Sequence, residues 1–145
     1  HSWFPRTPKT RITAPVQGVW LCGKDPLPVG HTNDFPPGWN LNEGVQANGS
    51  LVDNGYTGWN GNARIAWPER RLQLSVQMPD FEADGGAAQH FCLLNRPPQG
   101  PAFCFEPITH PINAFQLPQH PGLRILPRDE TLSLNIQWRI KALTV

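Results

Sequence analysis

Two carboxylates in the sequence stand where they could do chemistry. Glu106 ends the apolar run "FCFE" and precedes Pro107, which cannot donate to a sheet ladder, so we expect a strand that ends near Glu106. Asp53 lies in "VDNGYTGWNG", a glycine-rich stretch with aromatic neighbours. Aromatic faces cover the apolar side of a sugar ring while carboxylates accept hydrogen bonds from its hydroxyls. The pair therefore indicates carbohydrate chemistry.

Each carboxylate also has other interpretations. Glu106 could be a salt-bridge partner, and Asp53 could be a turn residue that hydrogen-bonds its own backbone. A glycosidase is a third possibility, because glycoside hydrolysis uses two carboxyl groups about 5–10 Å apart across a cleft.

Metal and nucleophilic chemistry have no support in the sequence. The histidines show no metal-ligand spacing such as H-x-x-x-H, and neither G-x-S-x-G nor a glycine-rich phosphate loop occurs. We therefore expect no metal and no cofactor. Cys22, Cys92 and Cys104 are an odd number, and we interpret them as small buried residues of a cytoplasmic, reducing environment.

The composition indicates the kind of fold that must position these groups. Seventeen prolines, thirteen glycines and a single methionine among 145 residues are typical of an all-β chain with many turns. The net charge of +1 gives no basic field, so nucleic acid is not an expected partner. No apolar run is long enough to span a bilayer, so we expect no membrane partner either.

Alternation of apolar and polar residues predicts the strands. Residues 131–143, "TLSLNIQWRIKAL", alternate strictly and predict a long strand with one buried and one solvated face. "NARIAWP" and "RLQLSVQM" predict an antiparallel hairpin. Further strands are predicted in "KTRITAP", "VQGVWL", "AAQHFCLL" and "PAFCFE".

Two long loops are predicted between these strands, over residues 23–61 and 107–122. They contain Trp39, Tyr56, Trp59 and Phe115, so we expect them to be packed rather than disordered. The simplest architecture is a single β-sandwich with aromatic-rich loops gathered at one side.

Four motifs in order, "HSWFPRTP", "VWLCGKDPLPVG", "LVDNGYTGWNG" and "FCFEPITHPINAF", resemble the C-terminal half of the aldose 1-epimerases, or galactose mutarotases. "EPITHPINAF" is the most specific part, followed by "DNGYTGW". The resemblance covers nearly the whole chain. It implies a β-supersandwich, with residues 1–145 forming the C-terminal portion of one domain as a partial sandwich of antiparallel strands. The N-terminal half of that domain would be absent here.

The resemblance also implies an activity, the interconversion of the α and β anomers of a free aldohexose without a cofactor. In the family, a carboxylate takes the proton of the C1 hydroxyl and a histidine protonates the ring oxygen. Matched by motif, Glu106 is the base, His1 the acid and Asp53 a substrate-binding group, and we expect its aromatic neighbours Tyr56 and Trp59 to bind the substrate as well. A base that is ionised near neutral pH should be partly buried with a hydrogen-bond donor nearby.

Departures from the family pattern leave alternatives open. Pro5 stands where galactose mutarotases proper have asparagine, which favours a broader aldose or hexose-6-phosphate epimerase. An arginine could bind the phosphate of such a substrate, and the alternative is that the arginines are solvated surface charges. The candidates are Arg64, Arg70, Arg71, Arg124 and Arg128. A non-catalytic carbohydrate-binding module on the same fold would use Asp53 and the tryptophans, but it would not need both His1 and Glu106.

The missing half carries a substrate-binding arginine and a second histidine in the family. We therefore expect this chain alone to be poorly active, and we expect an exposed sheet edge or apolar face that pairs with the missing half or with a second copy.

Overall fold

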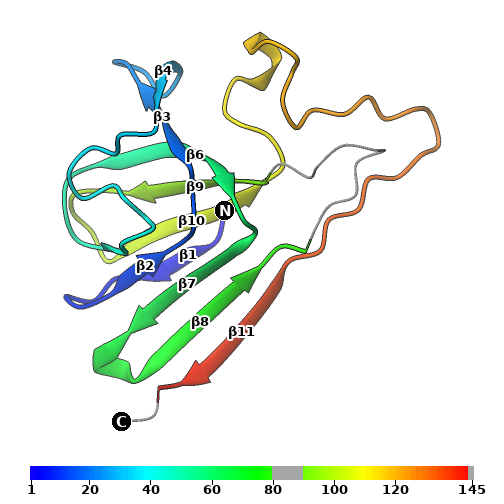
Figure 1. The fold of residues 1–145 in the computed structure, drawn as a ribbon. Helices are drawn as coiled ribbons and strands as arrows, with labels where there is room; N and C mark the ends of the chain where they lie inside the picture. Colours follow the sequence, from blue (N-terminus) through cyan, green and yellow to red (C-terminus); the bar gives the residue numbers. More distant parts are fainter. Residues whose placement is uncertain (80–89, 144–145) are drawn as a thin grey trace.

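The structure is a computed structural model that describes residues 1–79 and 90–143, and it is all-β (Figure 1). A six-stranded antiparallel sheet has the order β1-β10-β9-β6-β3-β4, and a five-stranded antiparallel sheet has the order β11-β8-β7-β2-β5. The six-stranded sheet consists of β1 (Trp3–Pro5), β3 (Gly18–Cys22), β4 (Pro28–Thr32), β6 (Val52–Trp59), β9 (His90–Arg96) and β10 (Ala102–Ile108). The five-stranded sheet consists of β2 (Arg11–Thr13), β5 (Val45–Gln46), β7 (Asn62–Trp67), β8 (Leu72–Gln77) and β11 (Gln137–Ala142). The predicted β-sandwich is confirmed.

Helical structure in the described chain is limited to two short 3-10 turns, η1 (Pro68–Arg70) and η2 (Ala114–Gln116). None of the described helical segments has the length and apolar character that a bilayer crossing requires.

The hydrophobic core lies between the two sheets. Alternate side chains of the six-stranded sheet point into it, among them Tyr56, Phe103 and Phe105, all with no exposed surface. Ile65 and Val76 enter it from the five-stranded sheet and are equally buried. We call the opposite side of the six-stranded sheet the outer face, and it is the face that carries Asp53 and Glu106.

The predicted hairpin is confirmed. Strands β7 and β8 pair antiparallel in the register Ile65↔Leu74, with η1 between them. Leu74, Val76 and Met78 are buried as the alternation predicts, whereas Leu72 is 37% exposed and Gln73, predicted to face solvent, is buried.

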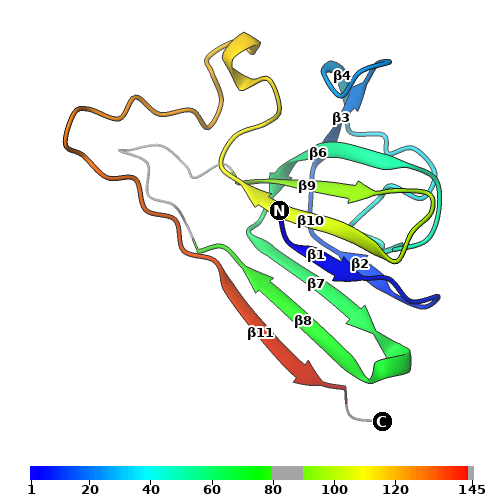
Figure 2. The same ribbon diagram turned by 180° about the vertical axis from the view of Figure 1, so that it is seen from behind.

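The long strand predicted over residues 131–143 is only half correct. Residues 131–136 form no strand, and β11 pairs with β8 in the register Trp138↔Val76. Trp138 and Ile140 therefore face the same way as buried Val76 and Leu74, yet they are 39% and 75% exposed. Phe4 of β1 packs against Trp138, with ring centroids 5.7 Å apart, whereas Ile140 stays largely exposed on β11, the outermost strand of its sheet (Figures 1 and 2). The expected buried face is therefore only partly formed, and β11 pairs on its outer edge with no strand of the described residues.

The first predicted loop, residues 23–61, contains β4, β5 and the whole of the eight-residue β6. "VDNGYTGW" is therefore a strand and not a glycine-rich turn. The pairing of β6 with β9 shifts register between Tyr56 and Trp59, and Gly58 adopts φ +61° at this bulge. Glycine at this position allows the left-handed backbone conformation that the bulge requires. Trp39, in the remaining loop, packs against the core as expected.

The second predicted loop, residues 107–122, differs from the observed structure in where it begins and in how Phe115 is packed. Strand β10 continues through Pro107 to Ile108, because β1 pairs only with residues 102–104 and leaves that edge of β10 without a described partner at Pro107. Phe115, expected to be packed, is 76% exposed.

The strand predicted over residues 87–94 corresponds to β9, which begins at His90. Residues 87–89 lie outside the described residues.

Candidate active site

The outer face aligns its polar residues in two neighbouring rows. Antiparallel pairing places Cys104 of β10 opposite Asn95 of β9, and Asn95 opposite Asp53 of β6. Two residues further along the strands, Glu106 pairs with Leu93, which pairs with Gly55. Because side chains alternate with a period of two, both rows point to the same side of the sheet.

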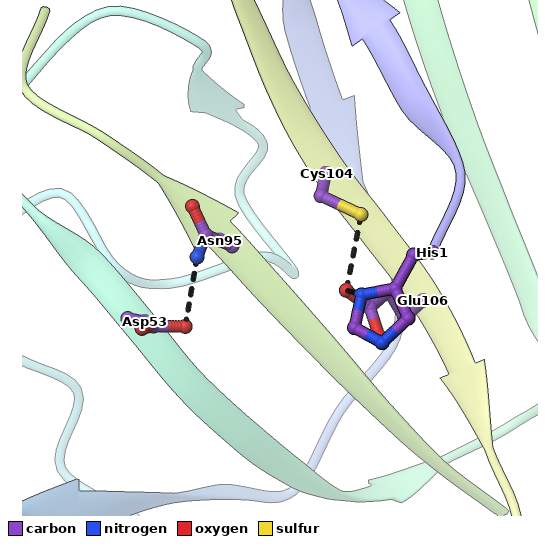
Figure 3. Close-up of polar contacts among 5 residues, drawn as sticks. All are labelled: His1, Asp53, Asn95, Cys104 and Glu106. Carbon is purple, nitrogen blue, oxygen red and sulfur yellow. Dashed lines mark hydrogen bonds and ion pairs between the residues drawn. The ribbon is translucent and has the colours of Figure 1, made fainter. Parts of the chain in front are cut away.

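Glu106 is the centre of a small polar cluster (Figure 3). His1 Nδ1 lies 3.0 Å from Glu106 Oε1, and the Cys104 thiol donates a hydrogen bond of 3.0 Å to the same oxygen. The Glu106 side chain is 12% exposed, whereas the His1 side chain is 84% exposed. The expectation of a partly buried carboxylate with a donor nearby is confirmed. Oε2 has no hydrogen-bond partner among the described residues, so one oxygen remains able to accept a proton.

Cys104 is a hydrogen-bond donor and not merely a buried apolar residue. Burial, followed by the hydrogen bond to Glu106, raises the pKa of Cys104 to about 12. The thiol is therefore protonated at neutral pH and keeps the hydrogen that it donates. The signal for this contact is present in the sequence, since residues two apart in a strand share a face.

Among the described residues, the same three side chains are also the group that could hold a metal ion. The nearest ligand atoms of His1, Cys104 and Glu106 lie within 4.8 Å of one another. Three protein ligands would leave one position of a tetrahedral zinc ion open, whereas structural zinc sites are closed by four protein ligands. The absence of a metal therefore stays a prediction from the sequence.

Asp53 lies on the outer face, one strand beyond Asn95. Asn95 Nδ2 donates a hydrogen bond of 3.1 Å to Asp53 Oδ1 and thereby orients the carboxylate (Figure 3). Asp53 and Glu106 are separated sideways by β9, which places their strands about 10 Å apart. Asn95 was not anticipated from the sequence, because its position depends on the register between β6 and β9.

The structure does not bring Tyr56 to this cluster. Tyr56 points into the core with no exposed surface, and its hydroxyl donates a hydrogen bond to the Trp39 carbonyl. Trp59 is 2% exposed, donates its indole N–H to the Asn62 carbonyl and packs edge-on against Phe105. Tyr56 lies on the other face because it is an odd number of residues from Asp53 within one strand.

The candidate phosphate-binding arginines lie elsewhere. Arg64 belongs to β7 of the five-stranded sheet, and Arg70 and Arg71 stand at η1. Arg128 is exposed and lies 3.7 Å from the carboxylate of its neighbour Asp129. The placement of these four residues favours solvated surface charges over phosphate ligands.

Comparison with known proteins supports the fold. No protein-family model matches the chain. The uncharacterized protein YphB of Escherichia coli K12 is 29% identical over 147 residues, which cover 95% of this chain and 49% of YphB. The crystal structure of a putative aldose 1-epimerase from Escherichia coli K12 superposes with a TM-score of 0.76 at 23% identity, over 97% of this chain and 48% of that chain. This chain thus spans about half the length of each relative, and the expected aldose epimerase-like fold is confirmed.

Proposed function

We propose that the protein is an aldose 1-epimerase that interconverts the α and β anomers of a free aldohexose. The observation that carries the proposal is the convergence of His1 and Glu106, with 3.0 Å between Nδ1 and Oε1, on the outer face of an epimerase-like fold. An acid and a base adjacent to one another can act on two oxygens attached to the same carbon, as ring opening requires. A glycosidase would instead pair Glu106 with Asp53, whereas the ionisable nitrogen in direct contact with Glu106 belongs to His1, and this contact favours the epimerase.

The proposed reaction consists of two proton transfers and a bond rotation. Glu106 accepts the proton of the C1 hydroxyl, His1 donates a proton to the ring oxygen, and the bond between C1 and the ring oxygen breaks to give the open-chain aldehyde. After rotation about the C1–C2 bond, the freed hydroxyl attacks the other face of C1 and both protons return. Each positioned acid or base typically contributes about 10²–10⁴-fold.

Asp53 is proposed to accept a hydrogen bond from a sugar hydroxyl. Its hydrogen bond from Asn95 fixes one carboxylate oxygen at 3.1 Å. Asp53 also lies on the same face as Glu106, so one sugar ring could contact both side chains.

We further propose that the complete site needs more chain than these 145 residues. Two observations support this proposal: the chain spans about half of each relative, and the apolar side chain of Ile140 is 75% exposed at the edge of a sheet. An N-terminal half of the same protein is the proposed partner at this edge.

Polarimetry of freshly dissolved α-glucose, α-galactose and glucose 6-phosphate tests the proposal. The full-length protein is expected to accelerate the optical-rotation change of at least one unphosphorylated sugar, and the 145-residue chain is expected to be slow. Failure of the full-length protein to exceed the buffer rate with all three sugars would overturn the epimerase assignment. A full rate from the 145-residue chain would overturn only the need for more chain.

Substitution of Cys104 tests its contact with Glu106. Cys104→Ala is expected to lower kcat/KM for mutarotation about tenfold, because hydrogen bonds to charged groups typically contribute about 1.5–3 kcal/mol and the thiol is a weaker donor. Cys104→Ser, whose hydroxyl can donate to the same oxygen, should recover most of the rate. Cys92→Ala is the matched control, since Cys92 is equally buried but points into the core. Equal rates for Cys104→Ala and Cys92→Ala would contradict a positioning role.

A further inference from the structure

The cluster of His1, Cys104 and Glu106 brings three kinds of metal ligand to one point of the outer face (Figure 3). Cys104 and Glu106 share this face because they are two residues apart in β10. His1 belongs to the segment that leads into β1, whose register pairs Trp3 with Cys104. Continued by two residues, this register places His1 opposite Glu106. Strand pairing therefore holds the backbones of all three residues in place.

The distances in the cluster are close to those around a zinc ion. Histidine nitrogen, cysteine sulfur and carboxylate oxygen bind Zn²⁺ at about 2.0–2.3 Å, so the ligand atoms of a tetrahedral site lie about 3.3–3.6 Å apart. Here His1 Nδ1 and Cys104 Sγ each lie 3.0 Å from Glu106 Oε1, and all three ligand atoms lie within 4.8 Å of one another. Small side-chain rotations therefore suffice to admit the ion.

The types of ligand select among ions. Thiolate and imidazole suit Zn²⁺, whereas Mg²⁺ and Ca²⁺ prefer sites made of oxygen atoms. Cys104 and Glu106 are largely buried, which keeps two of the ligands in fixed positions. The His1 side chain is exposed, so the ion has a path from solvent and water can take the fourth tetrahedral position.

We propose that this cluster is a reversible inhibitory site for Zn²⁺, with His1, Cys104 and Glu106 as its protein ligands. The inference rests on the proposed epimerase function and adds to it a regulation of the same site; the proposed reaction itself uses no metal. Coordination makes the Glu106 carboxylate a weaker base and occupies the His1 ring, so the bound ion stops both proton transfers of ring opening. The proton of the Cys104 thiol passes to solvent when sulfur binds the ion, because the thiolate is the metal ligand.

Zinc titration of mutarotation tests the proposal. The full-length protein is first freed of metal with EDTA and exchanged into metal-free buffer, and its rate with α-glucose is then measured by polarimetry as ZnCl₂ is added. We expect saturating Zn²⁺ to lower the rate at least about tenfold, since it blocks acid and base together, and renewed EDTA to restore it. MgCl₂ at the same concentration should leave the rate unchanged. An absence of inhibition by Zn²⁺, or equal inhibition by Mg²⁺, would overturn the inhibitory site.

Substitution of Cys104 tests whether its sulfur is a ligand. The hydroxyl of Cys104→Ser can still donate to Glu106 but is a poor zinc ligand, so the Zn²⁺ concentration that halves the variant's own rate is expected to rise at least about tenfold. Cys22→Ala is the matched control, because it removes a free, partly exposed thiol that lies outside the cluster. This control should be inhibited at the wild-type Zn²⁺ concentration. Equal sensitivity of Cys104→Ser and the wild type would overturn the proposed ligand set.

Calorimetric titration with ZnCl₂ separates this inference from the epimerase assignment. The full-length wild type should bind Zn²⁺ at a site that is lost in both Cys104→Ser and His1→Ala, whether or not mutarotation is observed. His1→Ala provides the second test if Cys104→Ser does not fold, since the His1 side chain is exposed and its removal leaves the core intact. Equal Zn²⁺ affinities of the wild type and both variants would overturn the site.

Discussion

Replacement of Glu106 with glutamine is expected to lower kcat for mutarotation by about 10²–10⁴-fold, the usual contribution of a positioned general base. Glutamine has nearly the shape of glutamate, and its carbonyl oxygen can still accept the hydrogen bond from Cys104. The amide cannot take up the proton of the C1 hydroxyl, so the variant should bind sugar but fail to open the ring. KM is therefore expected to change much less than kcat. Polarimetry of α-glucose over a range of concentrations gives both constants.

Glu130→Gln is the matched control for this experiment. Glu130 is exposed and lies outside the regular elements, so the same change of charge should leave the rate unaltered. Circular dichroism and thermal unfolding of both variants would establish that the sandwich is intact. Wild-type turnover by a folded Glu106→Gln variant would exclude Glu106 as the base.

The position of Glu106 was predictable because the relevant information is local. Alternation around "FCFE" places Cys104 and Glu106 on one face and Phe103 and Phe105 on the other, and the structure shows this division. The hairpin of β7 and β8 was predictable for the same reason, since its strands adjoin in sequence. Convergence of His1 with Glu106 followed from the family resemblance, because nothing local relates residues so far apart.

Other parts of the site depend on contacts that sequence patterns do not contain. Asn95 orients Asp53 only through the register between β6 and β9. The glycines of "VDNGYTGWNG" predict a turn with Tyr56 at the sugar, whereas the observed strand conformation directs Tyr56 into the core. The alternation in β11 predicts a strand but cannot say whether another layer covers it, and Ile140 is 75% exposed.

Arg96 is a buried side chain that stabilises the segment of residues 38–50, which leads into β6. It is 2% exposed, although it ends β9 with a charged side chain. Its guanidinium donates to three backbone carbonyl oxygens: from Nε to Ser50 at 3.0 Å, and from Nη1 to Gly38 at 3.1 Å and to Gln46 at 3.0 Å. Burial lowers the pKa of Arg96, but arginine remains charged near neutral pH. The side chain thus ties residues 38–50 to the six-stranded sheet through its own hydrogen bonds.

Arg96→Ala is accordingly expected to lower the free energy of unfolding by about 2–4 kcal/mol, because several carbonyl groups lose their donor at once. Arg96→Lys should recover only part of this loss, since an ammonium group cannot reproduce the planar fork that reaches Ser50 and Gln46 together. Arg64→Ala, at an exposed position of β7, is the control and should change stability by less than about 0.5 kcal/mol. Urea denaturation followed by tryptophan fluorescence measures all three variants. A loss from Arg96→Ala no larger than that from Arg64→Ala would show that water replaces the guanidinium without penalty. In that case the loop that leads into β6, and with it Asp53, would be held by the strand pairing of Val52 and Asp53 with β9 and by contacts such as the hydrogen bond from Asn48 to the Thr7 carbonyl.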